Sequence, residues 1–306
     1  LPICNQVLFE REMATTTAVW HEKQANVHPD PDTWNFTRPD QWETFTNNND
    51  HVHKLNMAIS PQSSDWALDD SRTGTELQNL LVEFVGTMLD RYQRNASYTW
   101  ADIVSETIDE GGVWRTDKAG TGSWEQPWYK IGSDANGVPS YIRIAFEEAQ
   151  AHGPNIKFVW DENALPTDTD GWDKVKNAII YLKGLGLRVD AIGSQFQLTH
   201  NNYHQDESRM LALRGLIDWA HQNDLAFFIT GLASDTDQLW QQEPQADLFK
   251  ALVGTLLAKR NNGDVGLVLW KLEPSKHWAD DATIFDSEYN PKPAYYAIQD
   301  TLEKVG

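Results

Sequence analysis

The sequence predicts an α/β fold of the (β/α)8 TIM-barrel class, with a first βα unit that is abbreviated or partly missing. From about residue 51 onward, short apolar runs alternate with amphipathic helical segments, a pattern typical of parallel strands joined by right-handed crossovers. No glycine-rich phosphate loop follows any run, which disfavours the alternative, an open doubly wound sheet. The 306 residues, of which 40% are hydrophobic, suit a single barrel domain over residues 1–306.

The strands are expected where β-branched and aromatic residues gather in short runs. These runs cover residues 13–19, 53–59, 98–104, 156–160, 189–192, 225–230 and 265–270. An eighth strand has to come from residues 1–8, a short and ambiguous segment. Helices are expected where apolar residues such as Leu77, Leu81, Phe84 and Met88 recur at helical spacing. They cover residues 74–94, 138–152, 172–185, 207–222, 245–261 and 293–304.

Composition and charge exclude some classes of binding partner. The net charge is -20, from 45 acidic and 25 basic residues, and such a field repels phosphate backbones, so no nucleic acid partner is expected. No apolar run is long enough for a membrane span. Cys4 is the only cysteine, which leaves a buried thiol or an intermolecular one. The glycosylation sequons at Asn35 and Asn95 favour an extracellular or secreted protein.

Long loops rich in glycine, aspartate and tryptophan follow two of the expected strands, over residues 109–133 and 161–171. In a barrel, the loops after the strands build the active face. Their length favours a groove for an extended ligand. The chain also holds 14 tryptophans. Most of them are expected in the core, but flat indole faces also stack on sugar rings.

A carboxylate at the end of a strand is the chemical signal that such a groove would need. Enzymatic cleavage of glycosides normally uses two carboxylates, one as acid/base and one as nucleophile or base. Trp100-Ala101-Asp102-Ile103-Val104-Ser105-Glu106 ends a strand in Glu106. This segment resembles glycoside hydrolase family 10, the endo-β-1,4-xylanase family, whose general acid/base is a glutamate at this place. The resemblance extends to residues 189–195, 267–270 and 285–295, and runs from about residue 9 to residue 306.

The resemblance implies a retaining xylanase barrel, but one of its two carboxylates is absent. The family's nucleophile ends the seventh strand in the pattern Ile-Thr-Glu-Leu, and this chain reads Ile229-Thr230-Gly231-Leu232. Gly231 therefore stands at the nucleophile position. Ser105 replaces an asparagine that binds the sugar, and Gln197 and Asn56 stand where the family has histidines.

Other positions match the family's sugar-binding residues. Lys23, Gln195, Trp270 and Trp278 fit the lysine, the glutamine and the aromatic floor that the resemblance implies. Val19 and Trp20 stand where the family has a Glu-Asn pair. Trp20 and Trp160 either line a reshaped sugar platform or fill space left by lost polar residues.

Three interpretations of Gly231 remain open: natural loss of catalysis, an engineered change, and chemistry that uses another carboxylate such as Asp235 or Asp237. Asn56, Ser105 and Gln197 all differ from the family's residues at their positions. This joint change favours natural loss, because the family's residues there help only when there is a nucleophile to position. Glu106 is then expected to bind a ligand hydroxyl.

We therefore expect a non-catalytic β-glycan-binding or structural pseudo-glycosidase. The alternative is an endo-β-1,4-xylanase engineered at Gly231 or using another carboxylate. The expected partner is a β-linked, xylan-like polysaccharide or oligosaccharide, and a protein assembly partner is also open. No cofactor is expected. No metal site is expected either, because no Cys and no His–Glu helix motif joins the pairs His51/His53 and His200/His204.

Overall fold

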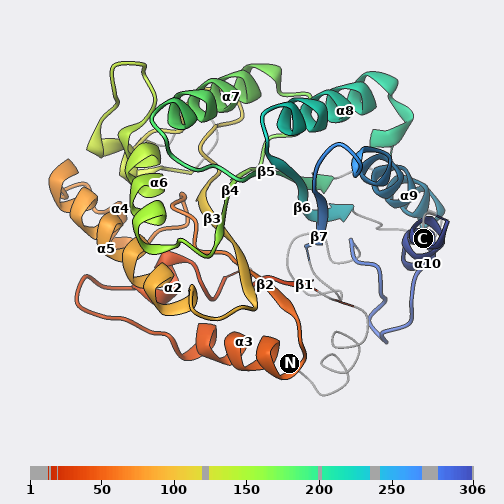
Figure 1. Ribbon diagram of the computed structural model, residues 1–306, viewed down its shortest axis with the longest axis horizontal. Coiled ribbons are helices and arrows are strands. Elements are labelled where there is room, and N and C mark those ends of the chain that lie inside the picture. Colours follow the sequence, from red (N-terminus) through yellow and green to blue (C-terminus); the bar gives the residue numbers. More distant parts are fainter. Residues whose placement is uncertain are drawn as a thin grey trace. The chain divides into compact units, whose positions relative to one another are not determined.

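The computed structural model describes residues 13, 15–18, 20–118, 124–198, 202–234, 242–270 and 282–304. The chain divides into two compact units, drawn with their helices and strands in Figure 1. The first unit comprises residues 6–164 and 168–190, and the second comprises residues 1–5, 165–167 and 191–306. That the two form a single domain stays a prediction.

The first unit is built on four parallel strands in the order in which the chain forms them. They are β1 (Thr15–Thr16), β2 (Val52–Leu55), β3 (Tyr98–Ser105) and β4 (Lys157–Glu162). Thr16 pairs with His53, His53 with Tyr98, and Ser105 with Asp161. The carboxyl ends of these strands therefore lie at one edge of the sheet, and the residues that follow them can meet there.

The described residues of this unit form six α-helices and one 3-10 helix: α2 (Gln24–Val27), α3 (Thr37–Asn48), α4 (Asp65–Leu68), α5 (Gly74–Tyr92), η1 (Pro127–Ile131), α6 (Ser140–His152) and α7 (Thr169–Gly184). A capping box starts α5, in which the Thr73 hydroxyl accepts from the Glu76 amide and the Glu76 carboxylate accepts from the Thr73 amide. The helix buries Leu77, Leu81 and Phe84 at the spacing the sequence predicted. It runs beside α6 (Figure 1).

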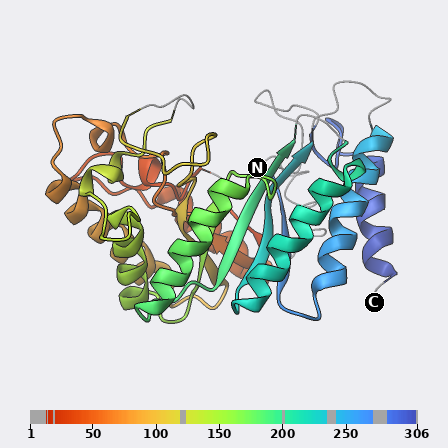
Figure 2. The ribbon, with the colours of Figure 1, turned by 90° about the horizontal axis from the view of Figure 1, so that it is seen from above.

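The second unit has three parallel strands, β5 (Ala191–Leu198), β6 (Ala226–Ser234) and β7 (Val265–Leu269), with β6 in the middle. Its helices are η2 (Tyr203–Gln205), α8 (Glu207–Gln222), α9 (Gln242–Lys259) and α10 (Pro293–Glu303). The last two lie side by side at the blue end of the chain (Figures 1 and 2). This strand–helix order is the expected one.

The structure contains the seven predicted strands and the six predicted helices, with ends that differ by a few residues. It also contains α2, α3 and α4, which were not predicted from the sequence. Two of these have four residues each, and α3 buries only Pro39 and Thr46, so it has no apolar stripe to reveal it. The expected eighth strand at residues 1–8 and Cys4 lie outside the described residues. None of the described helices is long and apolar enough to cross a membrane.

Candidate functional site

Glu106 directly follows the last residue of β3, as predicted, and is 9% exposed. Its amide donates a hydrogen bond of 3.0 Å to the Asp161 carbonyl on β4. Its φ angle is 55°, in the left-handed region that costs an L-residue other than glycine about 1–2 kcal/mol. Strain of this kind clusters at ligand sites, where the surrounding structure holds it in place.

Two buried side chains hold the backbone around Glu106. The Glu162 carboxylate accepts hydrogen bonds from the Thr107 amide at 3.0 and 3.1 Å and from the Trp160 indole at 2.7 Å. It also accepts from the Thr107 hydroxyl. On the other side, the Arg115 guanidinium donates to the Glu106 carbonyl at 3.2 Å. The backbone on both sides of the peptide bond between Glu106 and Thr107 is thus held by hydrogen bonds to buried side chains.

Burial raises the pKa of the Glu162 carboxyl from 4.5 to about 7, although the four donors from Thr107, Trp160 and Ile108 oppose the rise. Glu162 was not among the predicted site residues. Its only sequence signal is a second acid next to Asp161 at the end of an apolar run. The sequence also left the role of Trp160 open. The structure buries the Trp160 ring completely, beside Phe146 and Trp114, so this ring is part of the core.

Lys23 brings a positive charge to the same strand ends. The residue is 5% exposed, and its ammonium makes no hydrogen bond or ion pair within the described part of the chain. Burial lowers the pKa of Lys23, while the negative charges of Glu106, Asp102 and Asp161 act to raise it. The structure therefore places Lys23 near Glu106, and its donors remain available to a ligand.

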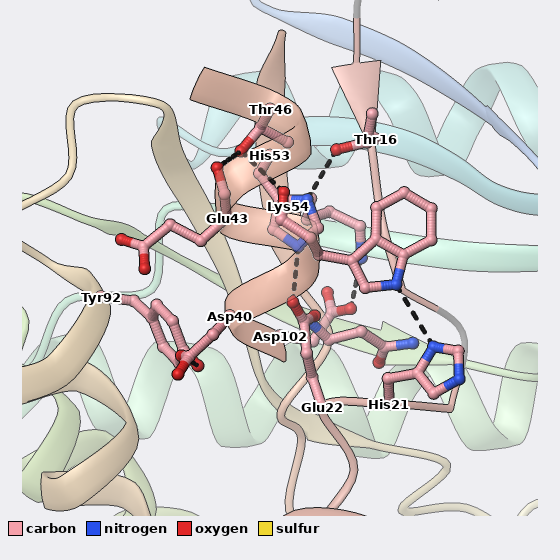
Figure 3. A network of polar contacts seen from close by, with 12 residues as sticks. Thr16, His21, Glu22, Asp40, Glu43, Thr46, His53, Lys54, Tyr92 and Asp102 are labelled. Atoms are coloured by element: carbon pink, nitrogen blue, oxygen red, sulfur yellow. Dashed lines mark hydrogen bonds and ion pairs between the residues drawn. The ribbon is translucent and has the colours of Figure 1, made fainter. Parts of the chain in front are cut away.

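The first unit also contains a buried polar network (Figure 3). His53 Nδ1 lies 2.6 Å from the Thr16 hydroxyl, and His53 Nε2 lies 2.6 Å from Glu22 Oε1. The other Glu22 oxygen accepts the Asn56 amide at 2.7 Å. Thr16, His53 and Glu22 are all buried. Their hydrogen bonds therefore connect β1, β2 and the segment before α2. Asn56, a predicted site residue, is half-buried directly after β2.

The Lys54 ammonium forms a buried ion pair with the Asp102 carboxylate, which joins β2 to β3 inside the first unit. Three residues further along β3, the hydroxyl of Ser105 is buried. It has no hydrogen-bond partner in the described portion of the molecule. Ser105 thus lies beside Glu106 in sequence, as predicted.

The second unit carries the other predicted residues. Gln195 and Gln197 lie on β5, where the Gln197 amide nitrogen donates to Gln195 Oε1 at 3.3 Å. Gly231 lies on β6 at a break in the regular pairing with β7. Trp270 follows β7, and its amide donates to the Leu232 carbonyl at 3.0 Å. The structure thus brings Gly231, Gln197 and Trp270 together.

The backbone at Gly231 is shaped for glycine. Its φ angle is 60°, and a Cβ added there would lie 3.2 Å from Trp270 Cε3 and 3.8 Å from Gln197 Nε2. Any side chain would therefore meet both a left-handed backbone and the indole ring. Trp278, Asp235, Asp237 and His200 lie outside the described residues. Among the residues that are described, no group of three or more His, Cys, Asp or Glu side chains could hold a metal ion.

Comparisons with known proteins agree with the resemblance noted in the sequence. The model of glycosyl hydrolase family 10 matches residues 3–301. Endo-1,4-beta-xylanase B of Thermotoga neapolitana is 24% identical over 308 residues, which cover 96% of this chain and 82% of that protein. Native xylanase 10B from Thermotoga maritima superposes with a TM-score of 0.83 at 22% identity, covering 98% of this chain and 90% of the other.

Xylanase 10B from Thermotoga petrophila, solved in complex with xylobiose, gives a TM-score of 0.82 at 23% identity, with 98% of this chain and 89% of the other covered. At these sequence identities, the structural similarity is evidence about the fold alone. It confirms the predicted (β/α)8 barrel class.

Proposed function

This chain belongs to glycosyl hydrolase family 10, and we propose that it binds an uncharged β-linked glycan of the xylan type without hydrolysing it. In this proposal Glu106 and Lys23 bind ligand hydroxyls in the first unit. In the second unit, Gln195 and Gln197 bind ligand hydroxyls, and the Trp270 ring packs against a sugar ring. Catalysis by the double displacement of retaining glycosidases is absent, because it needs a carboxylate where Gly231 stands.

The observation that carries the proposal is the backbone at Gly231. A glutamate replaced in a working enzyme would be expected to leave a backbone that still suits a side chain. At φ 60°, with Trp270 Cε3 3.2 Å from a Cβ position, a side chain at position 231 would instead meet backbone strain and would require the indole to shift. Loss of one member of a catalytic unit lowers the rate by several orders of magnitude.

Ligand binding is supported by the polar groups that remain. The Lys23 ammonium is a donor with no protein partner within the described residues, and Glu106 is an acceptor held in a strained backbone. Half-buried Trp270 offers an aromatic surface of the kind that packs on sugar rings. The net charge of -20 favours an uncharged glycan over an anionic one.

A second candidate is hydrolysis by another carboxylate, and one observation favours it. Asp161 is the penultimate residue of β4 and its carbonyl accepts the Glu106 amide, so two acidic residues lie near neighbouring strand ends. This arrangement would give an endo-β-1,4-xylanase with a relocated partner for Glu106.

One set of measurements separates the two candidates. Calorimetry with xylohexaose should show binding that is lost in Trp270→Ala and kept in Tyr296→Ala, which removes an exposed ring from α10. Xylan incubated with the protein should release no reducing sugar, with or without added azide. Azide restores turnover to a retaining enzyme that lacks only its nucleophile, and here the Trp270 ring borders the space it would need.

Reducing-sugar release that disappears in both Glu106→Gln and Asp161→Asn would establish the second candidate instead. If neither xylohexaose nor any other glycan on an array binds, the glycan-binding proposal is wrong, and a role as a structural subunit takes its place.

A further inference from the structure

Glu162 is a fully buried carboxylate at the end of β4. Among the described residues, four donors point to it: the Thr107 amide, the Thr107 hydroxyl, the Ile108 amide and the Trp160 indole. Removing a carboxylate from water is costly unless its lone pairs are satisfied by hydrogen bonds. This set of donors therefore suits a negative charge inside the first unit.

Burial and hydrogen bonding act in opposite directions on this carboxyl group. Burial raises the pKa of Glu162 to about 7, and the donors act to lower it. The ionised carboxylate can accept from all four donors at once. The protonated carboxyl has an O–H of its own, which competes with these donors, so at least one of them loses its partner or the Thr107 hydroxyl has to turn.

The amides that Glu162 accepts belong to the segment directly after Glu106. The carbonyls of the same segment have a different partner, because the Arg115 guanidinium donates to Glu106 at 3.2 Å and to Ile108 at 3.1 Å. The Arg115 amide also donates to the Thr107 carbonyl at 2.8 Å. Strain such as the φ of 55° at Glu106 persists only where the surrounding structure imposes it. Weaker bonds from Glu162 to the amides should therefore let Glu106 leave this conformation.

The other titratable and charged side chains on the surrounding segments are Tyr141 on α6, Arg115 and Glu106 after β3, and Asp161 on β4. Burial, with a smaller contribution from the charge of Glu162, raises the pKa of Tyr141 well above 10, so this phenol stays neutral from pH 5 to pH 8. Arg115 stays charged over the same range. A variant at position 162 removes the titration of Glu162 and keeps the other four side chains.

We propose that Glu162 is a positioning residue for Glu106, and that the affinity for ligand follows the ionisation of the Glu162 carboxyl group. This inference rests on the proposed function and adds pH regulation to it. The ionised Glu162 holds the Thr107 and Ile108 amides, which keeps the Glu106 carboxylate preorganised for a ligand hydroxyl. Protonation loosens this segment and weakens binding.

The first test is calorimetry with xylohexaose from pH 5 to pH 8. In the wild type, the dissociation constant should rise about tenfold from pH 8 to pH 5, the effect of one lost hydrogen bond to a charged group. Glu162→Gln, whose neutral amide imitates the protonated carboxyl, should bind at pH 8 as weakly as the wild type does at pH 5, with little change between. The control Glu83→Gln, which removes an exposed acid from α5, should follow the wild type.

A second test uses the unchanged protein. In NMR spectra without ligand, the Trp160 indole N–H and the Thr107 amide N–H should titrate together with a midpoint near pH 7. Saturating xylohexaose should move this midpoint down by about one pH unit, because the coupling between ligand and proton is reciprocal.

The two tests separate failure of this inference from failure of the proposed function. The same pH dependence of affinity in the wild type and in Glu162→Gln, or resonances that do not titrate, would overturn the inference alone. Absence of xylohexaose binding in the wild type at every pH would overturn the proposed function. Joint titration of the Trp160 and Thr107 resonances would then still support, and its absence overturn, the role of Glu162 in holding the segment after Glu106.

Discussion

Replacing Gly231 with alanine adds one methyl group to a backbone that suits none. The left-handed φ of 60° costs an alanine about 1–2 kcal/mol. The new Cβ would lie 3.2 Å from Trp270 Cε3, so the indole has to move, and overpacking of this kind costs about 1–3 kcal/mol. Alanine also lowers the conformational entropy of the unfolded chain, which offsets about 0.4–1 kcal/mol of this destabilisation. Gly231→Ala should therefore destabilise the protein by about 3 kcal/mol.

Gly137 provides the matched control for the backbone term. Its φ is 73°, and a Cβ there would meet nothing within 4 Å. Gly137→Ala should cost about 1 kcal/mol, because it carries the left-handed strain without the contact. The difference between the two variants then measures the contact with Trp270.

Urea unfolding followed by circular dichroism measures both free energies of unfolding. In a Trp270→Ala background, the cost of Gly231→Ala should fall to that of Gly137→Ala, since the two changes share one contact. If Gly231→Ala costs no more than Gly137→Ala in the wild-type background, the indole does not restrict this position. The same outcome would remove the main support for loss of the nucleophile.

Three further changes test other parts of the structure. Lys54→Met should lower the free energy of unfolding by about 3–5 kcal/mol, because it leaves the Asp102 charge buried and unpaired. The control Arg143→Ala, at a partly exposed ion pair, should lower it by less than about 1 kcal/mol. Equal losses in the two variants would contradict this reasoning. The Glu162 pKa, raised from 4.5 to about 7, stabilises the fold below pH 4.5, and this contribution, on the order of 3 kcal/mol, is lost as the pH rises through 7. Stability measured from pH 5 to pH 8 should therefore fall more steeply in the wild type than in Glu162→Gln, and parallel curves would refute the assignment. Gly215→Ala, inside α8 with open space around its Cβ position, should stabilise the protein by about 0.5–1 kcal/mol in thermal or urea unfolding, and a loss of stability would show an unseen contact.

The parts of the fold that were predictable are those with a local signal. Apolar periodicity located β3 and α5 because their buried residues recur at fixed spacing within one segment. The helix α3 has no such stripe, since Pro39 and Thr46 are its only buried residues. Its place depends instead on contacts with distant segments, such as the Arg91 ion pair with Asp40.

The candidate site divides in the same way. Glu106 was predictable because a strand end is visible in a single segment. The chain Thr16–His53–Glu22 was not, because 37 residues separate Thr16 from His53 and 31 separate Glu22 from His53. The left-handed backbone at Gly231 was also hidden, because a glycine in a sequence does not reveal its φ angle.

The left-handed backbone at Glu106 has a consequence for how this chain can change over generations. At φ 55°, a mutation to glycine would relieve strain of about 1–2 kcal/mol, so stability alone favours losing the carboxylate. Drift without a use for Glu106 would therefore run toward glycine, the residue that position 231 already holds. That position 106 holds a glutamate despite this strain agrees with the proposal that its carboxylate binds a ligand, because strained backbone of this kind clusters at ligand sites.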